Sequence, residues 1–191
     1  MAGIRFVSAA ILIFLFVFAT GRFKKSTRKQ HINSAIAGFL FLTVGNGCAV
    51  WALQFIDSGF AALLISTQPL ILIFMLYFLE KKPILPKSII GVILGIVGIY
   101  LLVNQESLGL NKDKILGMLA ILTALLCWGY GSIFVAKADL PKNYFVNTGY
   151  QMFTGGIMLF VLSLLFQESW SLPNEWSKDT QWSMVLLVLL G

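Results

Sequence analysis

Charged residues are scarce in this sequence. Asp, Glu, Lys and Arg together make up 12% of the 191 residues, whereas apolar residues make up 58%. A mean hydropathy of +0.87 lies far above the usual range of soluble domains. The scarcity of charge excludes an ordinary water-soluble globular domain, so we expect lipid to be the main solvent of the fold.

Cysteine and histidine are also rare, which narrows the available chemistry. Cys48 and Cys127 lie inside apolar stretches without the spacing of metal ligands, so we expect buried core residues, no disulfide framework, no metal site and no cofactor. The Ser and Thr residues at membrane depth have no partnered His or carboxylate, so an enzyme is not expected. The Lys and Arg residues sit in short connections between apolar stretches, so nucleic-acid binding is not expected either.

Long apolar stretches are what the sequence has in abundance. Crossing the hydrocarbon core of a bilayer takes roughly 17 to 25 helical residues. The stretches that qualify are 4–20, 34–56, 58–79, 88–103, 115–136 and 144–166, and a further one begins near Trp182 but is too short to span. These stretches are too long and too uniformly apolar for barrel strands, so the sequence predicts an all-α, polytopic transmembrane helix bundle.

Basic residues mark one side of the predicted membrane. Lys and Arg collect in the alternate connections 21–33, 80–87 and 137–143, whereas the other connections carry Asp and Glu with several Trp residues. Cytoplasmic loops collect Lys and Arg, so we expect these connections to be cytoplasmic in a multi-pass protein of the cell membrane. The first apolar stretch could pass for a signal peptide, but the basic residues after it favour a retained transmembrane helix.

Two segments of the chain each resemble a later segment, and both pairs are separated by the same number of residues. Residues 3–14 lie over 149–160, matching small with small and apolar with apolar residues, and 34–45 lie over 180–191. In this register the partner of 115–136 would precede the first residue. We therefore expect a five-helix repeat in two copies, of which this chain lacks the first helix and the last two to three helices. Because five is odd, the copies insert with opposite orientation, an inverted arrangement common among secondary transporters.

Short segments spread over nearly the whole chain resemble a known family in their order and spacing. They are Arg5-Phe6, Trp51-Ala-Leu with Ser58 to Leu64, Gln68-Pro69-Leu70 with Glu80-Lys81, the glycine-rich Gly91 to Gly98, and Cys127-Trp128-Gly129. Together they are similar to the drug/metabolite transporter superfamily, specifically to its EamA-type ten-helix members. The resemblance implies export or exchange of small metabolites, such as amino acids or related compounds, across the cytoplasmic membrane.

The same resemblance implies a domain organisation. Residues 1–103 correspond to the first EamA repeat, 104–114 to an external loop and 115–191 to the start of the second repeat, so that both inverted repeats are incomplete here. The leading hypothesis is a permease in which the repeats rock about a central site to give alternating access. The missing helices leave an alternative open, in which the chain is a non-transporting membrane scaffold or a truncated, inactive transporter fragment.

A proline and an amide stand together in the middle of one apolar stretch. Pro69 removes a backbone hydrogen bond and frees the carbonyl of Ile65, so we expect a helix kink there. Gln68, beside the proline, could donate a hydrogen bond to substrate. Alternatively, the kink is structural and neighbouring helices satisfy its polar groups.

Polar stripes run along two otherwise apolar helices. Asn46, Val50 and Gln54 lie on one helical face, which Thr43 extends, and Asn147, Gln151 and Thr154 form a similar stripe on a later helix. We expect both stripes to face one cavity near the repeat interface, where Asn46, Asn147 and Gln151 contact substrate. Hydrogen bonds between helices are the alternative role for each of them.

Aromatic and small residues complete the set of candidates. Trp51 and Trp128 could stack on a planar substrate or pack within the bundle. Gly91, Gly95 and Gly98 form a small-residue face that lets helices approach closely, either within the chain or between the subunits of a homodimer. No complete apolar stretch has Asp or Glu near its centre, so coupling to protons through a central carboxylate is not expected.

Overall fold

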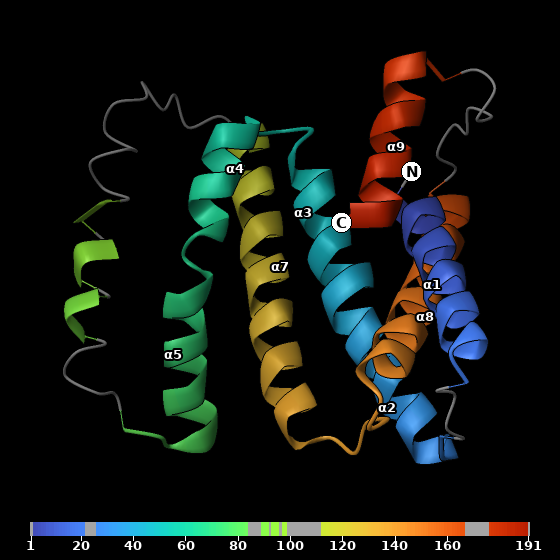
Figure 1. Cartoon of the computed structure of the whole chain (residues 1–191). Coiled ribbons are helices and arrows are strands. Elements are labelled where there is room, and N and C mark those ends of the chain that lie inside the picture. Colours follow the sequence, from blue (N-terminus) through green and yellow to red (C-terminus); the bar gives the residue numbers. More distant parts are fainter. Residues whose placement is uncertain are drawn as a thin grey trace. The chain divides into compact units, whose positions relative to one another are not determined.

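A computed structural model describes residues 2–21, 26–83, 89–91, 93–95, 97–98, 112–166 and 176–190. Within these ranges the secondary structure consists of helices and turns, without a strand. Five helical spans are long and apolar enough to cross a membrane: Ala2–Ala19, Arg28–Ala52, Ser58–Glu80, Lys112–Lys137 and Tyr144–Leu165. The prediction of an all-α, polytopic transmembrane bundle is therefore confirmed (Figure 1).

The helices follow the apolar stretches closely. Their bounds are α1 Ala2–Ala19, α2 Arg28–Gly38, η1 Phe39–Asn46, α3 Gly47–Ala52, α4 Ser58–Ile65, α5 Gln68–Glu80, α7 Lys112–Lys137, α8 Tyr144–Leu165 and α9 Lys178–Leu190. Helix η1 is π-helical and joins α2 to α3 without a turn. The described part of the expected helix 88–103 is helical at residues 89–91, 93–95 and 97–98, and the rest of it lies outside the described residues.

Helices α2 and α7 begin earlier than the hydropathy predicts. Helix α2 starts at Arg28, inside the expected basic connection 21–33, because Thr27 and Gln30 form a capping box that satisfies the first free amides. Helix α7 starts at Lys112, so the last residues of the expected external loop 104–114 form its first turn. Residues 104–111 of that loop lie outside the described part of the chain.

The chain forms two compact units. Unit 1 comprises residues 1–43 and 137–191, and unit 2 comprises residues 44–136. The chain passes from unit 1 to unit 2 inside the π-helical η1 and returns at the C-terminal end of α7. Each unit therefore has its own packing, which is described separately below.

Helix α8 is central to unit 1. It packs against α1 and α2, and α1 also contacts α9. Glycines bring these backbones together: a Cβ atom added at Gly3 would lie 3.2 Å from the carbonyl oxygen of Gly156, and one added at Gly155 would lie 2.9 Å from that of Gly38. In lipid, where apolar side chains gain little by leaving the solvent, such close approach supplies the van der Waals contact that holds helices together.

Unit 2 has a core of side chains from α3, α4, α7 and the turn between α3 and α4. Its buried members are Ala52, Ile56, Phe60, Ala61, Ala120, Ile121 and Leu125. Gly117 of α7 lies at the same interface, where an added Cβ atom would lie 2.8 Å from Cγ2 of Ile56. This packing fixes α4 beside α7 (Figure 1) and so positions the segment that follows α4.

Fully buried alanines lie inside each unit, and many large apolar residues are exposed on the outside. Ala10 and Ala37 of unit 1 and Ala52 of unit 2 are fully buried, whereas Phe78 is 74% exposed and Leu165 is 72% exposed. In water such exposure would create extensive apolar patches. Hydrocarbon chains accept it without cost, so this distribution is the one expected of a protein surrounded by lipid.

The contact between α2 and α8 gives a test of this packing. A Cβ atom added at Gly38 would collide with the backbone carbonyl oxygen of Gln151, and the helix backbone cannot move aside cheaply. We expect Gly38→Ala to lower the free energy of unfolding in detergent micelles by about 1 to 3 kcal/mol. Gly59→Ala is the matched control, because an added Cβ atom there meets no described atom within 4 Å. Equal stability of the two variants would contradict the packing.

Candidate functional site

The span Ser58–Glu80 is interrupted at its middle. The sequence predicts a kink at Pro69, but the structure shows a complete break: α4 ends at Ile65, α5 begins at Gln68, and Ser66 and Thr67 form a turn between them. In Figure 1 the two half-helices follow one another with an irregular segment between them, beside α7. The break is more severe than the predicted kink because two successive residues leave the helix.

The proline and the two hydroxyl residues explain the break. Pro69 has no amide hydrogen, and the amides of Leu70 and Ile71 both donate to the carbonyl oxygen of Thr67, at 2.9 and 3.2 Å. None of these three residues therefore donates to the carbonyl of Ile65 or Ser66. In a continuous helix the carbonyls of Ile65 and Ser66 would accept hydrogen bonds from the next turn. Here they are left free for other partners.

The two hydroxyl groups stabilise the end of α4. Ser66 Oγ donates to the carbonyl oxygen of Leu63, and Thr67 Oγ1 donates to that of Leu64, both at 2.6 Å. Side chains of this kind compete with the regular helical pattern of hydrogen bonds. The sequence analysis did not single out these two residues, although a Ser-Thr pair directly before Gln-Pro is a signal for such a break.

The depth of the break makes it a candidate site. It lies near the centre of a 23-residue span, so it falls near the middle of the bilayer. Irregular backbone at this depth is tolerated only where it is buried in protein or lines a water-filled cavity. In secondary transporters, such discontinuous helices form the substrate and ion sites.

Gln68 is the first residue of α5 and faces α7. Its Oε1 atom is buried without a hydrogen-bond partner. A Cβ atom added at Gly129 of α7 would lie 3.9 Å from Nε2 of Gln68 and only 2.5 Å from Sδ of Met75, so a larger residue at this position would clash with α5. The glycine therefore lets α5 approach α7, and Gln68 brings an unsatisfied acceptor into the contact.

An apolar cavity of about 320 Å³ adjoins the break within unit 2. It is lined by Leu64, Thr67, Ile71, Ile115, Met118, Leu119, Ile121, Leu122 and Leu125. Thr67 is the only hydroxyl-bearing residue in this lining, and it belongs to the break itself. A solute with an apolar body could therefore occupy the cavity while its polar end meets the break.

Three other candidates of unit 2 lie apart from this lining. Asn46 ends η1 and is half-buried, and its side chain makes no capping hydrogen bond to α3. Trp51 is 43% exposed with its ring packed edge-on against Phe55, at 4.8 Å between centroids, and Trp128 on α7 is 41% exposed. Stacking of either Trp ring on a substrate stays a prediction.

Asn147 and Gln151 belong to unit 1, where they join α8 to α2. Asn147 Oδ1 accepts hydrogen bonds from Ser34 Oγ at 3.1 Å and from Gln151 Nε2 at 3.0 Å. The rings of His31 and Tyr150 meet at the same interface, with their centroids 4.4 Å apart. This geometry favours the interhelical role that the sequence left open, and contact of the two amides with substrate stays a prediction.

The predicted glycine face is only partly occupied. A Cβ atom added at Gly95 would lie 3.2 Å from a methyl group of Leu70. At Gly91 and Gly98 an added Cβ atom would meet no described atom within 4 Å. Packing of a helix or of a second subunit on these two glycines stays a prediction.

Two of the basic connections meet at one end of unit 1. Gln30 Nε2 donates to Asp139 Oδ1 at 3.0 Å, and Asn33 Nδ2 donates to the carbonyl oxygen of Asp139 at 2.8 Å. These bonds tie the start of α2 to the connection between α7 and α8. The predicted orientation requires this arrangement, because it puts both connections on the same side of the membrane.

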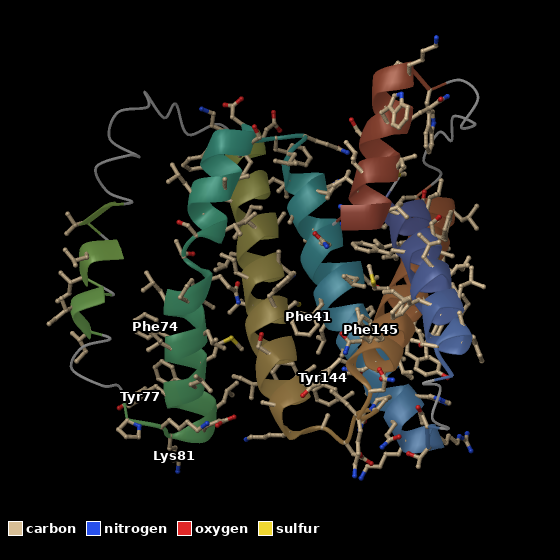
Figure 2. All side chains as sticks on the ribbon, viewed as in Figure 1. Phe41, Phe74, Tyr77, Lys81, Tyr144 and Phe145 are labelled. Atoms are coloured by element: carbon tan, nitrogen blue, oxygen red, sulfur yellow. The ribbon has the colours of Figure 1, made fainter. Side chains whose placement is uncertain are left out.

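Aromatic residues stand next to the basic connections. Figure 2 shows Phe74 and Tyr77 on α5, Lys81 directly after its C-terminal end, and Tyr144 and Phe145 at the start of α8. Tyr and Trp side chains are enriched at the membrane–water boundary, where they anchor helices at the level of the headgroups. Each of these helix ends thus has the composition of an interfacial segment.

The five apolar spans, the interrupted helix and the basic and aromatic helix ends define a polytopic helical membrane protein. The chain belongs to the EamA-like transporter family, which residues 1–104 match. The family resemblance seen in the sequence is therefore confirmed. Among the described residues, no group of three or more His, Cys, Asp or Glu side chains could hold a metal ion.

Several curated relatives carry transporter names. The chain is 27% identical over 192 residues to the uncharacterized transporter YoaV of Bacillus subtilis (strain 168), covering 100% of the chain and 64% of the relative. It is 31% identical over 171 residues to the uncharacterized inner membrane transporter YedA of Escherichia coli (strain K12), covering 88% and 53%. The chain thus spans between about half and two thirds of the length of these relatives.

The proline gives a direct test of the break. Pro69→Ala supplies an amide hydrogen that can donate to the carbonyl of Ile65, so we expect α4 and α5 to join. Amide hydrogen exchange at residues 66–71 should slow by about tenfold, the effect of one recovered hydrogen bond of ~1.4 kcal/mol. Pro83→Ala, in the exposed segment after α5, is the control and should leave this exchange unchanged. Unaltered exchange in Pro69→Ala would show that the proline does not cause the break.

Proposed function

We propose that this chain acts in the transport of small metabolites, such as amino acids or related compounds, across the cytoplasmic membrane. Membership of the EamA-like transporter family carries the proposal. The break between α4 and α5 supports it, because an interrupted helix at mid-depth costs backbone hydrogen bonds that a purely structural span would keep.

The division into two units supports alternating access as the mechanism. Alternating access requires two bodies that move against each other around a fixed site. The chain has two compact units, and one of the two passages between them lies inside the π-helical η1. π-Helical turns concentrate at functional positions, and their irregular hydrogen bonding lets a helix change direction there. Each unit combines a part of the first expected repeat, 1–103, with a part of the second, 115–191.

The substrate pathway in this proposal follows the break. Gln68 brings an unsatisfied oxygen to the α5–α7 contact. Asn46 is close to the point where the chain enters unit 2. Both side chains are neutral amides, which suit recognition of polar groups by hydrogen bonds. For Asn147 and Gln151, contact with substrate stays a prediction from the sequence.

The orientation in this proposal follows the basic connections. Residues 21–33, 80–87 and 137–143 face the cytoplasm, where positively charged loops are retained. The bonds from Gln30 and Asn33 to Asp139 support this orientation for the first and third connections. The relative YedA bears the name of an inner membrane transporter, which favours the cytoplasmic membrane for this chain as well.

A non-transporting scaffold is the second candidate. Its support is that no described atom lies within 4 Å of a Cβ atom added at Gly91 or Gly98, where another helix or a second copy of the chain could pack. A scaffold would form a homodimer through these glycines and would need no free acceptor at the break. The two candidates therefore differ in whether solute crosses the membrane.

Solute flux decides between the candidates. Proteoliposomes are prepared from the complete reading frame that contains this chain and are assayed for exchange of radiolabelled amino acids and nucleosides. We expect flux of at least one solute class, reduced about tenfold by Gln68→Ala and by Asn46→Ala, since each removes an interaction of ~1.4 kcal/mol. Thr20→Ala, at the exposed C-terminal end of α1, is the control and should keep full flux.

The outcomes separate the function from the site. Absence of flux for every solute, with a dimer that Gly91→Leu and Gly98→Leu disrupt, would favour the scaffold. Flux that both amide variants leave unchanged would keep the transporter and reject these two residues as its substrate contacts.

A further inference from the structure

The break between α4 and α5 leaves two backbone carbonyl oxygens without hydrogen bonds from the next turn. Pro69 has no amide hydrogen, and the amides of Leu70 and Ile71 are both bonded to Thr67. The hydroxyl hydrogens of the break are bonded back to α4, to the carbonyls of Leu63 and Leu64. The groups left over are the carbonyl oxygens of Ile65 and Ser66 and the backbone and side-chain amides of Gln68.

These oxygens lie within four consecutive residues. The carbonyls of Ile65 and Ser66 receive no hydrogen bond from the next turn, and Gln68 Oε1 is buried without a partner. The carbonyl end of α4 adds the negative end of its dipole at the same place. At the start of α5, Pro69 has no amide hydrogen and the amides of Leu70 and Ile71 are bonded to Thr67, which leaves the amide of Gln68 among the first amides of the helix. The break thus offers three acceptor oxygens to a cation, the carbonyls of Ile65 and Ser66 and Oε1 of Gln68.

One side of the break is open. Ile65 is 42% exposed and Ser66 is exposed too. Bare carbonyl groups near the middle of the bilayer cannot face hydrocarbon, where each unsatisfied group costs several kcal/mol. The exposed side of the break therefore faces water, a polar ligand or polar groups of a neighbouring helix.

We propose that the break binds a monovalent cation, either Na⁺ or the ammonium group of a transported solute. Neutral carbonyl, hydroxyl and amide oxygens suit a single positive charge, whereas Mg²⁺ and Ca²⁺ sites are built around carboxylates. From Ser58 to Leu79 the span contains no Asp or Glu. The apolar cavity of about 320 Å³ at Thr67 has room for the body of an ammonium-bearing solute.

This inference deepens the proposed function, on which it rests for the source of the cation. An inorganic ion at the break would drive or gate transport, whereas an ammonium group would belong to the substrate itself. Both have the same chemistry at the oxygens, so binding has to be measured with each cation separately and without relying on flux.

The reactivity of an introduced cysteine reports both whether water reaches the break and whether a cation occupies it. With Cys48 and Cys127 replaced by alanine, Ser66→Cys is treated with a water-soluble, membrane-impermeant methanethiosulfonate in proteoliposomes. We expect it to react, whereas Leu126→Cys, exposed at the middle of the regular helix α7, should not react because lipid surrounds it. Ala138→Cys, in the connection after α7, serves as the positive control.

Cation binding is read as protection of the same cysteine. The reaction rate is compared in NaCl, methylammonium chloride and choline chloride, each at about 150 mM so that screening is constant. We expect NaCl or methylammonium chloride to slow the reaction about threefold relative to choline chloride. This is the effect of a cation that protects the cysteine when bound and is present at about twice its dissociation constant. Protection should disappear when Pro69→Ala or Gln68→Leu is added.

Each outcome bears on the inference. Protection by Na⁺ alone identifies an inorganic ion site, and protection by methylammonium alone identifies a site for the solute's ammonium group. The inference would be overturned by equal rates in all three salts, or by a cysteine at position 66 that is as unreactive as the one at position 126. Full protection in both second-site variants would overturn it as well. Protection without any flux would reject the proposed transport but keep the cation site, and flux without protection would do the reverse.

Discussion

The absence of water from the bilayer core is the constraint on which this structure depends. Every backbone amide and carbonyl there must find a partner within the protein, because an unsatisfied group costs several kcal/mol. Unbroken helices meet this demand in α1, α7 and α8. The span Ser58–Glu80 departs from it at one place, between Ile65 and Gln68. The departure is informative because lipid makes it costly, so it has to be offset by water, protein or a ligand.

The same constraint explains why small residues hold the bundle together. Lipid chains solvate leucine as well as a protein interior does, so burial of large side chains adds little to helix association. Contact comes instead from close approach of backbones at Gly3, Gly38, Gly155 and Gly156 in unit 1 and at Gly117 in unit 2. Polar pairs such as Ser34 with Asn147 add hydrogen bonds at the same interfaces.

The sequence predicts the helices and their membrane character well, because the length and hydropathy of a stretch decide whether it can span. It predicts the position of the break at Pro69 but not its extent, because that depends on how the hydroxyls of Ser66 and Thr67 bond to α4. It leaves open the roles of Asn147 and Trp51, which depend on the rotation of each helix about its axis. That rotation is set by contacts distant in sequence, which a single sequence does not reveal.

Neutral oxygens at the centre of a span bind a cation independently of pH, whereas carboxylates would not. A carboxylate in lipid changes its charge with pH, so a site built on one couples binding to protons. The carbonyls of Ile65 and Ser66 and the amide of Gln68 do not titrate, so their attraction for a cation is independent of pH and varies only with geometry. Geometry is what a movement of α4 against α5 would change, because the turn at Ser66 and Thr67 is the part of the span without a continuous helical ladder. A cation at this place would therefore be bound or released by the angle between the half-helices, which couples binding to conformation through the same turn that supplies the ligands.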